Sequence, residues 1–323
     1  MTTLLKKLLR RIFPTAAPAI DVVAQIKALR INDGVLAGAY PIAPAGKVNW
    51  YFANLGLMGI VNKMSVADTD FYIRQYLDCF VRHVDLEGII FDYGPNGAEM
   101  PDSHDSYAAT FLSLVWEYEK HSGDTTWATG NMPVLKLMAY NCLTTQVKPN
   151  MLTSVFRNGV PSGIGYLMDN CEVYRGLRDF AALLRNRVDA DAGYYDSFAN
   201  QIPLGIRSLF STAYKPSDAH QSLETTFYPG TTCQVFPQAF GVAEMGDTFS
   251  PAYNYLNANS PGWEKGTYDP FPWAVLGYVA AVRNDAQKAR TQLATINTLF
   301  QSNRALVTIN ELGWYQRTTD LLK

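Results

Sequence analysis

The sequence is poor in charge and has no strong excess of either sign. It holds 27 Lys and Arg against 29 Asp and Glu in 323 residues, a formal net charge of −2, so composition gives no electrostatic reason to expect a nucleic-acid partner or an anionic membrane. It also lacks any run of about 18 apolar residues, which argues against a membrane-spanning helix. Because 48% of the residues are hydrophobic and only 17% are charged, the chain is expected to bury a large core.

Cysteine and histidine are scarce, and the cysteines are widely spaced. No Cys-x-x-Cys pair and no cluster of Cys with His is present, so no zinc site is expected, nor any other metal or cofactor. The sequence also lacks a glycine-rich dinucleotide loop, a phosphate-binding loop and a Gly-x-Ser-x-Gly elbow. The cysteines lie among apolar neighbours and are expected to be reduced, buried thiols, which favours a reducing compartment; they are Cys79, Cys142, Cys171 and Cys233.

The first residues intersperse basic residues among leucines and form no uninterrupted apolar segment. This pattern is not typical of a secretory signal peptide, and it predicts an amphipathic N-terminal extension over residues 1–19. We therefore expect a cytoplasmic protein without stable membrane insertion. No linker-like change of composition divides residues 20–323, which are expected to form a single domain.

Helical signals recur along the chain, and strand signals are sparse. Segments that are apolar almost all round alternate with amphipathic segments, as two concentric rings of helices require. The pattern predicts an all-α protein, an (α/α)₆ barrel with long loops at one end; a helical solenoid would need a fixed sequence period, which is not found. The predicted helices span residues 20–30, 49–61, 67–83, 105–121, 127–145, 151–157, 169–187, 191–210, 229–243, 251–258, 272–282 and 285–300.

Acidic residues at the starts of the inner helices would converge on one cleft, because the N-termini of these helices gather at one end of such a barrel. Three predicted helix starts carry such residues: Asp105, Asp169 and Asp269. Each has an ordinary structural alternative. Asp102 or Ser103 can cap the first of these helices, with Asp105 in its first turn, and Asp269 before a proline-rich start is typical of a helix cap.

Asp169 is the strongest catalytic candidate among these acids. It follows three large residues and precedes a largely buried helix, and burial raises a carboxyl pKa toward values useful for a general acid. The spacing of Asp169 and Glu172 also fits a capping box, and Glu172 is expected to cap the helix or to pair with Arg175. Aromatic residues near the third start are candidates for a wall on which a sugar ring stacks: Trp263, Tyr268 and Trp273.

Three segments resemble six-hairpin glycosidase-like proteins. Residues 48–56, Val-Asn-Trp-Tyr-Phe-Ala-Asn-Leu-Gly, resemble the first inner helix of that superfamily. Residues 103–107, Ser-His-Asp-Ser-Tyr, and residues 166–170, Tyr-Leu-Met-Asp-Asn, are similar to the two catalytic segments of the unsaturated glucuronyl hydrolases. The likeness in helix pattern covers most of residues 34–315, although Ser106 and Tyr107 stand where those hydrolases usually show glycine.

The resemblance implies an (α/α)₆ barrel and a set of site residues. It implies Asp105 and Asp169 as the acid pair, with carboxyls within about 10 Å of each other, and His104 as a substrate contact. The other substrate-binding residues that we expect at the cleft are Trp50, Asn54, Asp102, Gln234, Trp263, Tyr268 and Trp273.

The predicted function is therefore that of a glycoside hydrolase or an unsaturated uronyl hydrolase that acts on an oligo- or polysaccharide. Asp169 would protonate the leaving group and Asp105 would orient a water molecule. Two alternatives stay open. A sugar epimerase or polysaccharide lyase on the same fold would commonly rely on His or Tyr bases, and the chain has only four His. A non-catalytic carbohydrate-binding protein would keep the aromatic residues but would not need the two acids to face one another.

Overall fold

The computed structural model describes residues 19–154, 156–157, 160–161 and 163–323. The N-terminal extension predicted over residues 1–19 lies outside the described residues except for its last position, and the amphipathic helix predicted there stays a prediction. The same holds for the extent of the single domain predicted over residues 20–323.

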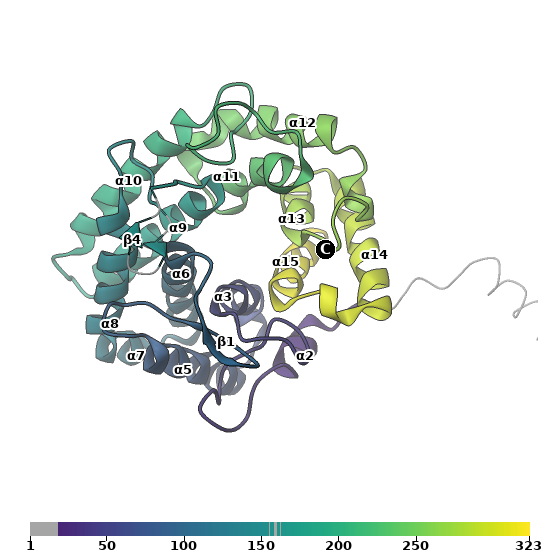
Figure 1. Cartoon of the computed structure of the whole chain (residues 1–323). Helices are drawn as coiled ribbons and strands as arrows, with labels where there is room; N and C mark the ends of the chain where they lie inside the picture. Colours follow the sequence, from purple (N-terminus) through teal and green to yellow (C-terminus); the bar gives the residue numbers. More distant parts are fainter. Residues whose placement is uncertain (1–18, 155, 158–159, 162) are drawn as a thin grey trace, which may run out of the picture.

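An inner ring of helices surrounds the axis of the molecule, as the view along this axis in Figure 1 shows. Each member of the ring contacts the next, and the last contacts the first, so the ring closes. In chain order the members are α3 (Trp50–Met58), α6 (His104–Ser122), α9 (Leu167–Arg185), α11 (Phe236–Ala239) with the 3₁₀ turn η6 (Thr232–Val235) before it, α13 (Ala274–Val282) and α15 (Ile309–Leu321).

An outer ring covers the inner one, and the chain alternates between the two rings (Figure 1). The two rings differ in burial as the sequence predicts. Outer helix α14 buries only Ala289, Gln292 and Ile296, which lie on one face, whereas inner helix α6 is buried along most of its length. The main outer helices are α2 (Val22–Lys27), α5 (Gln75–His83), α8 (Met132–Met138), α10 (Ala192–Ser208), α12 (Phe249–Asn259) and α14 (Ala286–Ser302).

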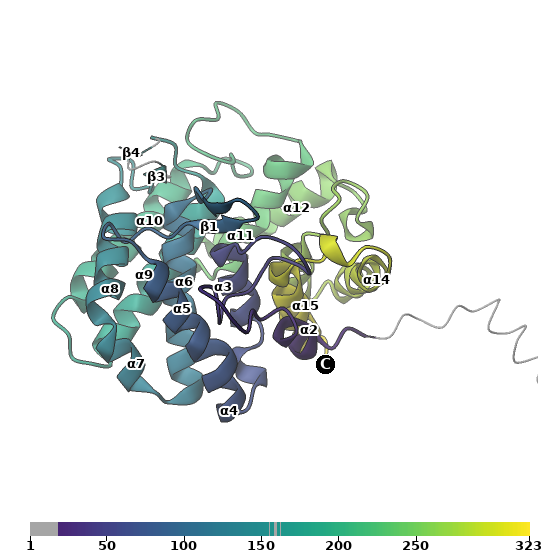
Figure 2. The ribbon, with the colours of Figure 1, turned by 60° about the horizontal axis from the view of Figure 1, so that its bottom comes forward.

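The remaining described elements are short. Two hairpins, β1 (Asp92–Gly94) with β2 (Gly97–Glu99) and β3 (Phe156–Arg157) with β4 (Val160–Pro161), are the strands of the described residues. They lie toward the upper end of the barrel in Figure 2, whereas α4 (Val66–Asp68) and α7 (Thr125–Gly130) lie toward the lower end. The all-α architecture of an α/α barrel is thus confirmed.

Small residues allow the inner helices to approach closely. A Cβ on Gly59 of α3 would lie 2.5 Å from Gly313 Cα of α15, and a Cβ on Gly176 of α9 would lie 2.6 Å from Ala109 Cα of α6. Both distances are far below a van der Waals contact, so a larger residue at either glycine would push neighbouring inner helices apart.

The structure differs from the predicted helices in three places. The helix expected over residues 229–243 is instead a succession of short turns, η5 (Phe227–Thr231), η6 and α11. The helix expected over residues 151–157 is absent: its described residues form an extended stretch and β3. The last inner helix, α15, follows residue 300, where the predicted helices end. Its sequence mixes polar and apolar residues, and this weakens the periodic signal on which the prediction relied.

Candidate active site

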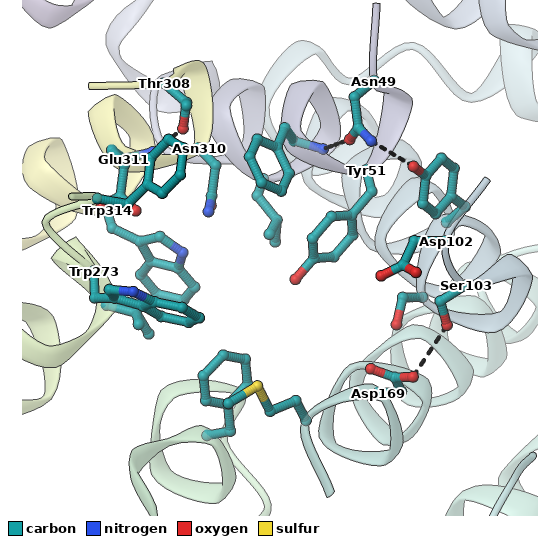
Figure 3. A pocket seen from close by; sticks show the side chains of 18 of the residues that line it. Asn49, Tyr51, Asp102, Ser103, Asp169, Trp273, Thr308, Asn310, Glu311 and Trp314 are labelled. Atoms are coloured by element: carbon teal, nitrogen blue, oxygen red, sulfur yellow. Dashed lines mark hydrogen bonds between the residues drawn. The ribbon is translucent and has the colours of Figure 1, made fainter. Parts of the chain in front are cut away.

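A cleft of about 370 Å³ opens at the end of the barrel where the inner helices begin. Figure 3 shows polar side chains around it from several inner helices. The expected convergence of the helix starts on one cleft is therefore observed. The lining residues are Asn49, Tyr51, Phe52, Leu55, Asp102, Ser103, Ser106, Tyr107, Met168, Asp169, Tyr228, Phe236, Phe240, Phe271, Trp273, Val275, Thr308, Asn310, Glu311 and Trp314.

Asp169 lies in the first turn of α9 and faces this cleft. Its Oδ2 lies 3.0 Å from Ser103 Oγ, the hydroxyl of the residue that precedes α6 (Figure 3). The same hydroxyl also hydrogen-bonds to Asp105 Oδ1. Because both carboxyls contact one hydroxyl, they lie well within the expected 10 Å.

Asp105 does not face the cleft, contrary to the expected pairing of two acids across it. Its side chain is fully buried and is not among the lining residues. Besides Ser103, it accepts hydrogen bonds from the Ser106 backbone N–H at 3.0 Å and from Thr153 Oγ1 at 3.2 Å. Asp105 therefore lies behind Ser103, where it cannot orient a water molecule against a substrate in this cleft.

A third carboxyl, that of the buried Glu172, lies beside this pair, one helical turn after Asp169. Its Oε1 accepts a hydrogen bond of 2.6 Å from the hydroxyl of Tyr51, which lines the cleft. The expected ion pair between Glu172 and Arg175 is wrong, because Arg175 pairs with Glu117 and Asp179 instead.

The environment of these three carboxyls raises their pKa values. Burial raises the pKa of Asp105 to about 6 and that of Glu172 to about 8. Burial, together with the negative charges of Asp105 and Glu172, raises the pKa of Asp169 well above its usual range. Such a perturbed group in a cleft is a candidate general acid.

Glu311 is a further cleft carboxyl that the sequence analysis missed. It lies in the first turn of α15, whose start is capped by Thr308, and its Oε2 accepts the Ala274 N–H at the start of α13 at 2.5 Å. Burial raises its pKa to about 7. Thr308 and Glu311 have capping-box spacing, so the sequence did hold a signal for a helix start here.

An aromatic wall forms another side of the cleft. Trp273 and Tyr228 line it with ring centroids 5.0 Å apart, and Phe271 lies beside them in the lining. Trp273 adopts a left-handed backbone conformation, φ 52°, which is uncommon for a bulky residue and typical of functional sites. Within the described residues, no acceptor is found for Trp273 Nε1–H.

Of the other expected stacking residues, Tyr268 lies near this wall, and Trp263 does not contribute to it. The Tyr268 ring stacks on Phe227 at 5.1 Å, and Phe227 meets Trp273 edge to face. Tyr268 is 41% exposed but is not among the lining residues. Trp263 is buried and donates its indole N–H to Asn257 Oδ1, so its role is in the core.

Several predicted substrate contacts are buried in the protein instead of facing the cleft. Trp50 donates its indole N–H to Phe91 O, and Asn54 donates to Thr110 Oγ1 and accepts from Tyr76. Gln234 hydrogen-bonds to the backbone of Tyr214 and of Gly230. His104 is buried at the start of α6 and is not among the lining residues. A direct substrate contact is not supported for these four residues.

Asp102 lies where its predicted role as a substrate contact requires, whereas Asp269 does not cap the helix that it was expected to cap. Asp102 is exposed and lines the cleft (Figure 3), next to the N-cap residue Ser103, so the structure places it where a substrate contact is expected. Asp269 accepts the Phe271 N–H in a local turn, and the N-cap of α13 is Trp273. The helix-cap interpretation of Asp269 is therefore wrong by a few residues.

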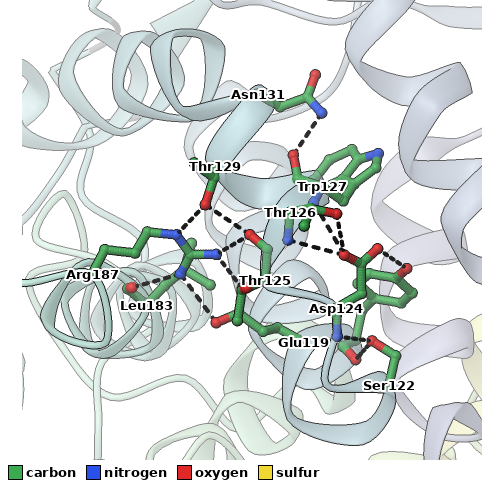
Figure 4. Close-up of polar contacts among 11 residues, drawn as sticks. Glu119, Ser122, Asp124, Thr125, Thr126, Trp127, Thr129, Asn131, Leu183 and Arg187 are labelled. Carbon is green, nitrogen blue, oxygen red and sulfur yellow. Dashed lines mark hydrogen bonds and ion pairs between the residues drawn. The ribbon is translucent and has the colours of Figure 1, made fainter.

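The opposite end of the barrel contains acids that are paired with cations. Near the C-terminus of α6, Glu119 is buried and pairs with Arg187, which also bonds to Thr129 and to the Leu183 carbonyl (Figure 4). A smaller cavity of about 210 Å³ lies at this end, and Asp320 beside it pairs with Lys63 at 2.9 Å.

Two searches of the described residues bear on other classes of protein. No group of three His, Cys, Asp or Glu side chains is arranged to hold a metal ion. No described helix has the length and apolar character needed to cross a membrane.

No protein-family model matches this chain, and no curated protein matches it in sequence. Solved structures do match it in fold. A glycosidase variant is 14% identical with a TM-score of 0.64, over 93% of this chain and 95% of that chain. An α-amylase from Clostridium perfringens is 10% identical with a TM-score of 0.63, over 92% and 96%. A rhamnosidase from Klebsiella oxytoca with rhamnose bound is 14% identical with a TM-score of 0.62, over 89% of this chain and 57% of that chain. The chain thus shares its α/α-barrel fold with glycosidases.

Proposed function

We propose that the protein is a glycoside hydrolase in which Asp169 is the general acid and Glu311 is the general base. The observation that carries this proposal is that the two carboxyls line the same cleft, although they come from inner helices, α9 and α15, that are not neighbours in the ring. Hydrolysis of a glycosidic bond needs two such carboxyls, one on each side of the bond.

Asp169 suits the role of the acid. It lies among other carboxyls, and its pKa is raised well above the usual range, which favours the protonated form that a general acid needs. In the proposed step, the Asp169 proton passes to the glycosidic oxygen as the bond from this oxygen to the anomeric carbon breaks.

Glu311 suits the role of the base. Its carboxylate accepts a backbone N–H at the start of α13, and helix N-termini favour negative charge. A pKa of about 7 makes it an effective base near neutral pH. In the proposed step, Glu311 takes a proton from a water molecule while the water oxygen bonds to the anomeric carbon. The two carboxyls lie on inner helices that are not neighbours in the ring. We therefore propose that a water molecule fits between the two carboxyls and that the anomeric configuration is inverted.

The lining of the cleft favours a neutral sugar over a uronic acid. The charged side chains among its lining residues are Asp102, Asp169 and Glu311, all acids, and a second negative charge would be repelled. The aromatic wall with Trp273 offers a face for a sugar ring. Structures of similar fold contain glucose in a glycosidase and rhamnose in a rhamnosidase, both neutral sugars, whereas no described basic side chain lines this cleft for a uronate.

The test is turnover of a panel of neutral, acidic and unsaturated-uronyl oligosaccharides, followed by release of reducing ends and by the ultraviolet absorbance of the unsaturated uronate. We expect release from a neutral glycoside, with the first product in the inverted configuration by proton NMR. Absence of turnover on every sugar, with glycan binding unchanged in Asp169→Asn, would instead favour the non-catalytic binding protein. Elimination or epimerised products would favour the lyase or the epimerase.

A further inference from the structure

Ser103 contacts two carboxyls with a single hydroxyl group. Its Oγ lies within hydrogen-bonding distance of Asp105 Oδ1 and of Asp169 Oδ2. A hydroxyl has one proton and can donate it to only one acceptor. The second contact is favourable only if that carboxyl is itself protonated and donates to the lone pair of Ser103, because two unprotonated oxygens at this distance repel each other.

The other contacts of the two carboxyls indicate which of them holds the proton. Asp105 also accepts from the Ser106 N–H and from the Thr153 hydroxyl, and hydrogen bonds donated to a carboxylate favour its charged form. The Thr153 hydroxyl also lies 3.1 Å from Asn170 Oδ1, so its single proton is shared between two acceptors, whereas the Ser106 N–H is donated to Asp105. For the Asp169 carboxyl, by contrast, the hydrogen-bond contact found among the described residues is the one with the Ser103 hydroxyl.

We propose that Asp105 is a positioning residue that acts through Ser103: it accepts the hydrogen bond of the Ser103 hydroxyl and thereby turns a lone pair of that hydroxyl toward Asp169, so that the Asp169 carboxyl is held in its protonated form. The proposal rests on the role of Asp169 as the acid. It gives Asp105, which does not touch the cleft, a function in the reaction without any contact to substrate.

The ionisable groups around this pair reinforce the same state. Burial is the largest cause of the raised pKa of Asp169, and the negative charge of Asp105 is the next. No described Lys, Arg or His side chain lines the cleft to offset these charges. The groups that face the two carboxyls are Asp102 and Tyr51 from the starts of α6 and α3, Glu172 and Cys171 from α9, Tyr228 from the segment before η6, and Cys142 from the segment after α8.

The main test is the pH profile of kcat/KM for Asp105→Asn on the glycoside that the wild type hydrolyses best. Replacing the charge by a neutral amide lowers the pKa of Asp169, and the reaction needs protonated Asp169. The alkaline limb of the profile is therefore expected to move to lower pH by about one unit or more. Ser103→Ala, a second variant in case Asp105→Asn does not fold, is expected to move the limb in the same direction.

A matched control is Asp179→Asn, which removes a buried carboxyl from the same helix as Asp169. Its charge is compensated by Arg175, so its alkaline limb is expected to stay at the position found for the wild type. A limb that stays in place in both Asp105→Asn and Ser103→Ala, while Asp169→Asn abolishes turnover, would overturn the proposal and leave the proposed function intact.

A second readout separates the proposal from the proposed function. The protonation of Asp169 can be followed in the full chain by carbon-13 NMR of labelled aspartate, with Asp169→Asn to assign the signal. A midpoint that falls in Asp105→Asn supports the proton-holding role even if no glycoside is hydrolysed. A midpoint that stays in place contradicts this role whatever the activity.

Discussion

At the end of the barrel where the inner helices begin, three carboxyls, those of Asp105, Asp169 and Glu172, lie next to one another; at the opposite end, Glu119 and Asp320 each lie next to an arginine or a lysine. Asp105 and Asp169 share a serine hydroxyl, whereas Glu119 pairs with Arg187 and Asp320 with Lys63. Both groups are acids on inner helices or beside them, so their surroundings, and not their residue type, distinguish them.

The difference follows from helix electrostatics and from function. Helix N-termini favour negative charge and C-termini favour positive charge, so acids without a cation are tolerated at the first end and cations are favoured at the second. An acid with a cation has a stable charge and suits a structural role. An acid without one keeps its proton and suits proton transfer. We therefore assign the chemistry to the first end and structural ion pairs to the second.

The largest expected effect is a loss of turnover on changing Glu311, at the cleft end of the barrel. Glu311→Gln keeps an oxygen that can accept the Ala274 N–H but removes the base. We expect kcat to fall by about 10²–10⁴-fold, with little change in the thermal midpoint. The measurement is steady-state kinetics on a neutral glycoside, and a loss below tenfold would show that Glu311 is not the base.

Turnover by the wild type should depend on pH in a way that identifies the same residue. Glu311 must be ionised to act, and its pKa is raised to about 7, so kcat/KM is expected to rise as pH increases through about 7. The acidic limb should be absent from the residual activity of Glu311→Gln. An unchanged acidic limb in this variant would assign it to another group.

The next effect is a loss of stability on changing Arg187, at the end of the barrel opposite the cleft. Arg187→Met leaves Glu119, only 4% exposed, without its cation. We expect a loss of about 3–5 kcal/mol in the free energy of unfolding, with kcat unchanged for the protein that remains folded. Adding Glu119→Gln should restore part of the loss. If Arg187→Met lowers kcat without lowering stability, the two ends do not differ as described.

An effect of opposite sign on stability is expected for Glu172, at the cleft end of the barrel. The pKa of Glu172 is raised to about 8, so folding must keep a proton that the unfolded chain releases above its ordinary pKa of about 4.3. Glu172→Gln should therefore match the wild type near pH 4 and gain stability as pH rises to about 8, on the order of 5 kcal/mol at most. Urea unfolding at a series of pH values measures this, and a loss of stability at pH 8 would contradict it.

The fold was predictable because alternating apolar and amphipathic helices have few ways to bury their faces. Asp169 was predictable because a carboxyl between large apolar residues at a helix start is partly desolvated. Trp50 and Asn54 were assigned to the cleft, but Tyr51 and Phe52 line it instead. Since this helix is apolar almost all round, its periodicity does not indicate which face meets the cleft.

Glu311 and Glu172 were misjudged for different reasons. Glu311 follows the last predicted helix, and its helix has a weak periodic pattern, so its capping-box spacing was not considered. Glu172 has an arginine three residues later, and sequence spacing favoured that pair. Arg175 instead reaches Glu117 on α6, a contact that only the packing of two inner helices creates.

The most direct test compares one acid from each end in the same assay. Turnover of a neutral glycoside is measured for the wild type, Asp169→Asn and Asp320→Asn, with the folded fraction of each determined by circular dichroism. We predict that Asp169→Asn loses about 10²–10⁴-fold in kcat, and that Asp320→Asn, which loses only a partly exposed ion pair, loses about 1 kcal/mol of stability or less and no turnover. Equal turnover in the wild type and Asp169→Asn would contradict the account.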